Sequence, residues 1–197
     1  MYLIFKRVFD LLFSCVLLVL LFPLLLVVGL FIYFIDGSPV FFLQKRAGLN
    51  GLPFQLIKFR TMNFDKESGQ NNVTKLGRLL RSTSIDELPS LINIALGSMS
   101  LIGPRPLHHF YVERYSAKQF RRLAVLPGIT GYAQINGRNA LDWNEKFELD
   151  CFYVDNISLK LDLYILCKTF FVVLFMKDVN PANSSEMPEF LGSDDSK

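Results

Sequence analysis

The hydrophobic positions of this chain are concentrated at its N-terminal end. Between Val8 and Ile35 only Asp10 carries a charge, and roughly 20 apolar residues are enough for a helix to cross a bilayer core. Pro23 lies near the middle of this stretch, where its missing N–H breaks or kinks a helix. Each half, 11–22 and 23–35, reaches roughly 18–20 Å as a helix and falls short of a core of roughly 30 Å. The pattern predicts a membrane helix that is broken at a proline.

Basic residues stand on both sides of this apolar segment. Lys6 and Arg7 precede it, and Lys45, Arg46, Lys58 and Arg60 follow it. Because positive residues mark the cytoplasmic side of a membrane segment, both ends of the segment are expected on one face. We therefore predict that residues 1–36 form a re-entrant helical hairpin, with a kinked spanning helix as the alternative.

After this segment, short stretches of strand and helix pattern follow one another. "VFFLQKRAG" and "LPFQLIKFRTM" have the alternation of strands, whereas the polar residues 63–75 have the composition of an exposed loop. Helical patterns cover "KLGRLLRS", "LINIALG" up to Gly97, residues 141–155 and the apolar run 161–176. These elements predict an α+β fold in which a small, mostly helical domain, 37–178, has a short sheet and interfacial amphipathic helices. The polar tail, 179–197, has no core-forming pattern and is predicted to be disordered.

Charge limits the partners of the protein. The 197 residues carry a formal net charge of +3 and are 51% hydrophobic, and no Lys/Arg block of the kind that binds nucleic acid is present. We therefore expect no nucleic acid partner. A slightly basic chain with an apolar end is typical of a protein at an anionic membrane surface.

The stretch "RSTSIDELPSLINIALG" contains two adjacent carboxylates, Asp86 and Glu87. One interpretation is structural, because Ser84 and Glu87 have the spacing of a capping box at a helix start. The other is catalytic, because adjacent acids can hold Mg²⁺ together with phosphate oxygens, and an aspartate can attack phosphorus. The residues of this stretch alone leave both interpretations open.

Several cationic side chains occur in short segments where a rigid backbone can orient them. Arginine suits phosphate because its planar fork stays charged and donates paired hydrogen bonds. In "MSLIGPRP" two prolines flank Arg105 and stiffen its loop. The predicted phosphate-binding residues are Lys58, Arg60, Arg81, Arg105 and Arg138, although any single arginine could instead form a structural ion pair.

Four motifs together resemble a known family. "DGSPVFFLQKRAG", "KFRTM", "SIDELPSLINIALGSMSLIGPRP" and "PGITGYAQINGRN" look like those of the bacterial monotopic phosphoglycosyl transferases. These small membrane enzymes start glycoconjugate assembly on a polyprenol carrier. The resemblance runs from about Lys6 to about Met176 with the motifs in the expected order. The chain departs from the family pattern in two places. Phe22 stands before Pro23 where the family often has a serine, and Tyr132 stands where a tryptophan is common.

The resemblance implies a specific reaction. Such enzymes transfer a phosphosugar from a UDP-sugar to polyprenol (undecaprenyl) phosphate, giving polyprenol-diphosphate-sugar and UMP. Asp86 corresponds to the nucleophile, Asp86 and Glu87 to the Mg²⁺-binding dyad, and Arg105 and Arg138 to residues around the phosphates. Pro23 corresponds to the break of the re-entrant helix, with the catalytic domain on the cytoplasmic face of the bacterial inner membrane.

Three points stay open at this stage. The same reaction could run through a ternary complex with Asp86 as a metal ligand only, and the chain could instead be a non-enzymatic scaffold that binds anionic lipid. A homodimer is compatible with the sequence. No motif identifies the sugar or the glycoconjugate.

Overall fold

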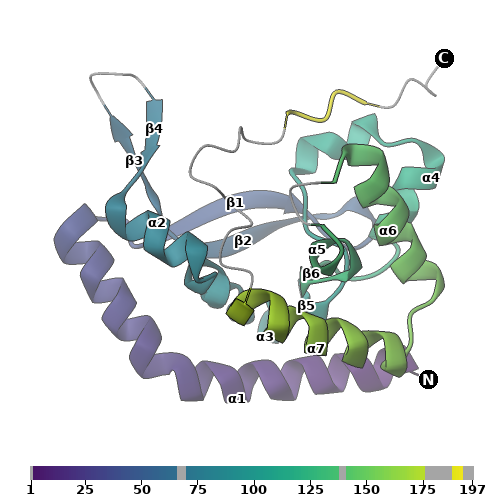
Figure 1. Cartoon of the computed structure of the whole chain (residues 1–197), viewed down its shortest axis with the longest axis horizontal. Coiled ribbons are helices and arrows are strands. Elements are labelled where there is room, and N and C mark those ends of the chain that lie inside the picture. The colour runs from purple at the N-terminus through teal and green to yellow at the C-terminus, as the bar shows by residue number, and fades with distance from the viewer. Residues whose placement is uncertain (1, 66–69, 138–140, 176–187, 193–197) are drawn as a thin grey trace.

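The computed structural model describes residues 2–65, 70–137, 141–175 and 188–192. One long N-terminal helix lies along one side of a body that mixes short helices with three two-stranded sheets (Figure 1). The predicted mixture of helix and sheet is therefore confirmed.

The long helix α1 spans Tyr2–Phe31 and continues as a π-helix, η1, over Ile32–Asp36. Figure 1 shows that α1 is bent, so that it first passes beneath α3 and α7 and then rises beside α2. Pro23 lies inside α1, and a proline in a helix interior is a common cause of such a bend. The prediction of two separate arms is corrected in one respect, because the α-helix continues through the proline instead of ending there.

Most of the surface of α1 is apolar and exposed. Only Asp10, Ser14 and Val28 are buried in it, whereas Ile4 and Val19 are 74% and 75% exposed, and Phe34 of η1 is 78% exposed. Within the described residues, the helix from Tyr2 to Asp36 is the one long and apolar enough to cross a membrane, by length and composition. An exposed apolar surface of this length calls for a non-aqueous environment or a partner.

Polar contacts fix the first three turns of α1 to the body. The buried Asp10 carboxylate accepts hydrogen bonds from the Ser100 hydroxyl at 2.6 Å and the Leu101 amide at 3.3 Å. Arg7 donates to the carbonyl of Ile94 at 2.9 Å, near the end of α3. Charged groups buried with hydrogen-bond partners define one orientation of a helix better than apolar packing alone, so the start of α1 is part of the folded body.

Two antiparallel hairpins follow α1. β1 (Phe41–Ala47) pairs with β2 (Pro53–Phe59), with the 3-10 turn η2 (Leu49–Gly51) between them. This pair confirms both predicted strands. β3 (Met62–Asp65) pairs with β4 (Gln70–Val73), so the prediction of a loop over 63–75 is wrong for this part of the chain. Its polar residues do not show the alternation of a half-buried strand because the β3–β4 hairpin projects away from the body (Figure 1).

A run of short helices carries the acidic pair. α2 (Lys75–Ser82) begins at Thr74, whose hydroxyl accepts a hydrogen bond from Gly77 N. η3 (Ile85–Ser90) is a 3-10 helix and leads into α3 (Leu91–Leu96). The end of α3 at Gly97 confirms the predicted helix end, and Gly97 has a left-handed backbone with φ of 97°. The predicted capping box is wrong, because Ser84 is left-handed with φ of 57° and makes no capping hydrogen bond. The Glu87 carboxylate is therefore free for other contacts.

The remaining elements enclose the core. β5 (Ser100–Ile102) pairs in parallel with β6 (Gly128–Thr130). The helices around them are η4 (His109–Arg114), α4 (Ala117–Phe120), η5 (Arg121–Leu123), α5 (Tyr132–Ile135), α6 (Trp143–Asp155) and α7 (Leu159–Phe175). The helices predicted over 141–155 and 161–176 are thus confirmed. The main core joins α3, β2, β5, α6 and α7, with Leu17, Leu18 and Leu21 of α1 packed against it.

The C-terminal tail differs in part from the prediction of disorder. Residues 179–187 and 193–197 lie outside the described residues, but 188–192 lie against the body. Phe190 is 3% exposed and belongs to an aromatic cluster with Tyr111 and Phe147. A single large ring in a polar segment gives no periodicity, so the sequence pattern could not identify it.

Candidate active site

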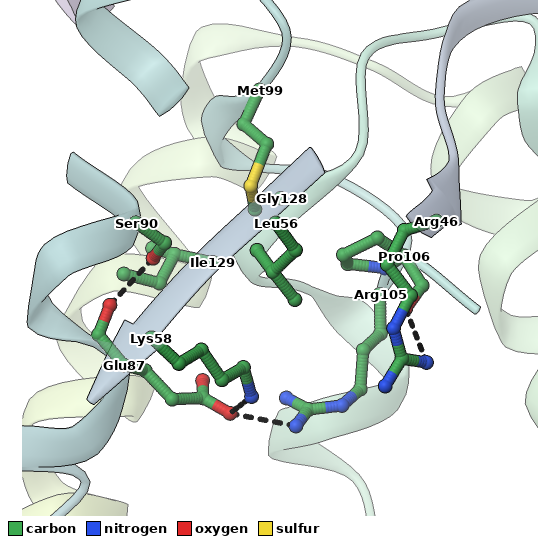
Figure 2. A pocket seen from close by; sticks show the side chains of 10 residues that line it. All are labelled: Arg46, Leu56, Lys58, Glu87, Ser90, Met99, Arg105, Pro106, Gly128 and Ile129. Atoms are coloured by element: carbon green, nitrogen blue, oxygen red, sulfur yellow. Dashed lines mark hydrogen bonds and ion pairs between the residues drawn. The ribbon is translucent and has the colours of Figure 1, made fainter. Parts of the chain in front are cut away.

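The Glu87 carboxylate lies at the centre of a cluster of charged side chains. η3 carries it toward β2, where the Lys58 ammonium lies 2.6 Å from Glu87 Oε1. The Arg105 guanidinium lies 2.7 Å from the same oxygen, and Figure 2 shows both cations converging on this one carboxylate oxygen. The structure thus brings together three predicted site residues from segments far apart in the sequence.

Opposing effects set the protonation of this cluster. Burial by itself would raise the pKa of Glu87, but the Arg105 and Lys58 charges hold that pKa well below its usual range. Burial lowers the pKa of Lys58 despite the attraction of Glu87, and the Glu87 charge raises the pKa of Arg105. Glu87 is therefore ionised at neutral pH and serves as an electrostatic anchor.

Asp86 has a different environment from its neighbour. No ion pair or hydrogen bond joins its carboxylate to any residue that the structure describes. Burial and the adjacent Glu87 charge raise the pKa of Asp86 to about 6, while the Lys58, Arg81 and Arg105 charges act in the opposite direction. Within the described part of the chain, the acidic pair therefore contains one neutralised carboxylate and one without a salt-bridge partner.

Close backbone packing fixes the loop that carries Arg105. Gly103 follows β5 and donates its amide to Thr130 O at 2.9 Å. A Cβ at Gly103 would meet Leu126 O at 2.3 Å, so the backbones approach to a distance that only glycine allows. Together with the prolines on either side of Arg105, this contact presents the guanidinium on a rigid support.

A buried ion pair supports the same loop from behind. Arg122 and Asp150 are 2% and 4% exposed in their side chains, and Arg122 Nη2 lies 2.7 Å from Asp150 Oδ2. The same Nη2 donates to the carbonyl of Arg105 at 2.7 Å. Because a buried ion pair costs desolvation and is weak evidence of stability by itself, its bond to the Arg105 backbone suggests a positioning role. The sequence pattern did not identify this pair, because its members lie outside the four motifs.

Arg46 in β1 is a further residue of the site that the sequence interpretation did not assign to phosphate. Its guanidinium lies beside that of Arg105 in Figure 2 and donates to Pro106 O at 3.3 Å. Burial and the Arg105 charge lower the pKa of Arg46 to about 10. Lys58, Arg105 and Arg46 together carry more positive charge than the single Glu87 carboxylate offsets, and such an excess favours a bound anion. The segment "QKRAG" was the available signal, since it stands inside one of the resembling motifs.

The other predicted phosphate-binding residues are placed differently. Arg60 donates to the carbonyls of Asp36, Gly37 and Ser38, at 2.6, 2.5 and 2.9 Å, so it holds the end of the N-terminal helix. Arg81 donates to the Thr61 hydroxyl at 2.9 Å and acts on Asp86 through its charge. Arg138 lies outside the described residues.

The donor set determines whether Mg²⁺ suits the site. The described residues contain no group of three or more His, Cys, Asp and Glu side chains that could hold a metal. Mg²⁺ is often held by only one or two carboxylates plus substrate phosphate oxygens. Asp86 has no cation partner among the described residues and Glu87 has a second oxygen, so the two residues fit Mg²⁺ when phosphates complete its coordination.

Comparison with known proteins gives the family. Residues 1–176 match the family model described as bacterial sugar transferase. The chain belongs to the bacterial sugar transferase family. It is therefore a transferase, and its three hydrogen-bonded site residues all lie within the matched region.

Three relatives illustrate the range of this bacterial sugar transferase family. The uncharacterized sugar transferase EpsL of Bacillus subtilis (strain 168) is 50% identical over 98% of each chain. A UDP-glucose:undecaprenyl-phosphate glucose-1-phosphate transferase of Klebsiella pneumoniae is 41% identical over 85% of this chain. A UDP-N-acetylgalactosamine-undecaprenyl-phosphate N-acetylgalactosaminephosphotransferase of Aeromonas hydrophila is 36% identical over 88% of this chain. The matches cover only 40% and 44% of the last two proteins.

The raised pKa of Asp86 predicts that this residue reduces stability at neutral pH. Its folded pKa of about 6 lies above the ordinary 3.8, so ionisation costs stability above pH 6, and the cost disappears as the pH falls below about 4. In metal-free buffer, Asp86→Asn is expected to stabilise the chain at pH 7.5 by at most about 3 kcal/mol, at 1.36 kcal/mol per pKa unit. Denaturant unfolding in detergent at pH 7.5 and pH 4 measures this gain and its loss.

The exposed acid Glu113 provides the matched control for that measurement. Glu113→Gln is expected to change stability by less than about 0.5 kcal/mol at either pH, as for most surface substitutions. If Asp86→Asn is no more stable than the wild type at pH 7.5, the description of Asp86 as a partly desolvated carboxylate with a raised pKa is wrong.

Proposed function

We propose that the protein transfers a phosphosugar from a UDP-sugar to polyprenol (undecaprenyl) phosphate through a covalent intermediate on Asp86. The products are polyprenol-diphosphate-sugar and UMP. The observation that carries the proposal is the asymmetry of the acidic pair. Glu87 is neutralised by Lys58 and Arg105, whereas the Asp86 carboxylate has no partner among the described residues. The names of the Klebsiella and Aeromonas relatives support the donor and acceptor classes.

The first half-reaction forms a bond between Asp86 and phosphorus. An Asp86 oxygen attacks the β-phosphorus of the UDP-sugar, and the bond from that phosphorus to the bridging oxygen breaks. UMP leaves with the bonding electrons, and the phosphosugar stays on the aspartate as an acyl phosphate. A carboxylate with a pKa of about 6 is mostly ionised at neutral pH, and no salt bridge to a described residue reduces its nucleophilicity.

The second half-reaction returns the carboxylate. A phosphate oxygen of the polyprenol phosphate attacks the phosphorus of the intermediate, and the bond between phosphorus and Asp86 breaks. This forms the diphosphate linkage and regenerates Asp86 without a net change of protonation. Donor and acceptor use the same nucleophile in turn, so the kinetics are ping-pong.

The cations around the dyad position the phosphates. Arg105 and Arg46 present two guanidinium groups on rigid backbone, and arginine forks match the geometry of phosphate oxygens. Lys58 and Arg105 keep Glu87 ionised and in place. Asp86 and Glu87 are the residues that would hold Mg²⁺, which offsets negative charge on the phosphoryl oxygens when it is bound.

The membrane arrangement follows from the apolar surface. Apolar side chains are exposed along α1, and α7 exposes Leu163, Phe170 and Phe171. Arg7 and Asp10 join the start of α1 to the body. We propose that α1 enters the cytoplasmic face of the bacterial inner membrane as a bent, re-entrant helix, and that α7 lies at the same interface. A water-soluble donor and a lipid acceptor can then meet at one site.

This arrangement predicts that both ends of the chain face the cytoplasm. A protease-sensitive tag before Tyr2 and a second tag after Lys197 are expected to be cleaved together in inside-out membrane vesicles and protected together in spheroplasts. Immunoblotting of the two tags measures this. Cleavage of the N-terminal tag only from the periplasmic side would contradict the re-entrant arrangement and support a kinked spanning helix.

The covalent step predicts a labelled protein when the lipid acceptor is absent. Purified protein, Mg²⁺ and a UDP-sugar labelled in the β-phosphate are expected to give about one UMP and one labelled aspartate per active site. Mass spectrometry of proteolytic fragments locates the label at residues 85–90. Asp86→Asn is expected to give no label.

The control variant is Glu113→Gln, which removes a carboxylate on the exposed side of η4 and should label like the wild type. An unlabelled wild-type protein that still makes product when the acceptor is added would favour the ternary-complex reaction. Full turnover by Asp86→Asn would likewise exclude Asp86 as the nucleophile.

A further inference from the structure

The segment Pro188–Gly192, here called the C-terminal clip, occupies an aromatic groove on the body. Phe190 is 3% exposed. Its ring centroid lies 5.1 to 5.8 Å from the four rings that form the groove, which are those of Tyr111, Tyr115, Trp143 and Phe147. Edge-to-face and tilted contacts over these distances are the favoured geometries of aromatic pairs. The body therefore holds one side chain of the clip as an anchor.

Side chains of the body also bind the backbone of the clip. Trp143 Nε1 donates to Pro188 O at 2.9 Å, and the Phe190 amide donates to the Tyr111 hydroxyl at 3.3 Å. Arg114 donates to Phe190 O at 2.5 Å and pairs with Glu189 at 2.7 Å. Hydrogen bonds to successive backbone groups fix the register of an extended segment, so the groove recognises a short acidic-aromatic sequence.

The clip contacts the element that follows the Arg105 loop. Tyr111 and Arg114 belong to η4, which begins four residues after Arg105. Between them, Leu107 O accepts from Ala47 N at 3.0 Å, and His108 pairs with Arg46 across an isolated β-bridge. A shift of η4 therefore moves the backbone that carries both guanidinium groups of the site.

The clip also contacts the other support of Arg105. The Arg122 guanidinium lies 5.6 Å from the centroid of the Phe147 ring and 5.9 Å from that of the Tyr115 ring, and both rings belong to the groove. Arg122 in turn donates to the Arg105 carbonyl at 2.7 Å. The groove is thus linked to Arg105 by two independent routes, one through η4 and one through Arg122.

We propose that the C-terminal clip, anchored by Phe190, is a positioning element that holds Arg105 and Arg46 in register for the phosphates of the donor. The inference rests on the proposed function, because it assigns phosphate binding to these two arginines. Phe190 is a positioning residue, since it acts through η4 and Arg122 and lies in the aromatic groove rather than beside the dyad.

The single tryptophan of the chain allows clip binding to be observed directly. Trp143 is the one tryptophan in the sequence, and it contacts both Pro188 and Phe190. In the full-length chain, Phe190→Ala is expected to shift the Trp143 emission to the red and to lower kcat/KM for UMP release from the UDP-sugar about tenfold, equivalent to about 1.4 kcal/mol. Leu191→Ala, at a side chain that is 82% exposed, is expected to change neither.

Rescue by a peptide separates positioning from a general loss of stability. The peptide Met-Pro-Glu-Phe-Leu-Gly-Ser, added to the Phe190→Ala chain, is expected to restore the emission and the activity with the same half-saturating concentration. The peptide with alanine for phenylalanine should restore neither. Full activity of Phe190→Ala, or a peptide that restores emission without activity, would overturn the proposal.

The outcome also distinguishes failure of the clip from failure of the proposed function. A wild-type chain that releases no UMP, while the peptide still changes the Trp143 emission of Phe190→Ala, would overturn the proposed function and the positioning role that depends on it. A wild-type chain that releases UMP, together with an equally active Phe190→Ala chain, would overturn the clip alone.

Discussion

The ion pairs of Glu87 with Lys58 and Arg105 are the interaction on which the site depends. They join β2, η3 and the loop after β5, three parts of the chain that have no common sheet. Removing the Glu87 carboxylate would leave the Lys58 and Arg105 charges close together without a counter-ion, and an uncompensated buried charge is strongly destabilising. These contacts neutralise one member of the acidic pair, whereas Asp86 has no salt bridge to any residue that the structure describes.

The fold combines this charged cluster with an extensive exposed apolar surface on α1. The buried Asp10 and the hydrogen bonds of Arg7 make the start of α1 part of the body, whereas most of the remaining helix exposes apolar side chains. Arg60 and the packing of Val28 and Ile32 against Phe59 and Leu80 join the far end of this helical segment to the body as well. Such an arrangement suits the proposed reaction, in which a soluble nucleotide sugar meets a lipid phosphate.

The strongly patterned parts of the chain could be predicted from sequence, and the unpatterned contacts could not. Alternation and periodicity identified β1, β2, α2, α6 and α7, and the apolar run identified α1. The β3–β4 hairpin was not identified because its polar residues lack alternation. The expected capping role of Ser84 failed because that residue is left-handed, which a spacing rule cannot detect. The motifs indicated Glu87 and Arg105, but the roles of Arg46, Arg122 and Phe190 depend on long-range packing that no local pattern encodes.

The most direct test of the account is isotope exchange between UMP and the UDP-sugar in the absence of polyprenol phosphate. A covalent intermediate on Asp86 makes the first half-reaction reversible by itself, so labelled UMP is expected to appear in the UDP-sugar pool with the wild-type protein and not with Asp86→Asn. If the wild-type protein forms product with the acceptor but shows no exchange without it, the covalent role of Asp86 is wrong.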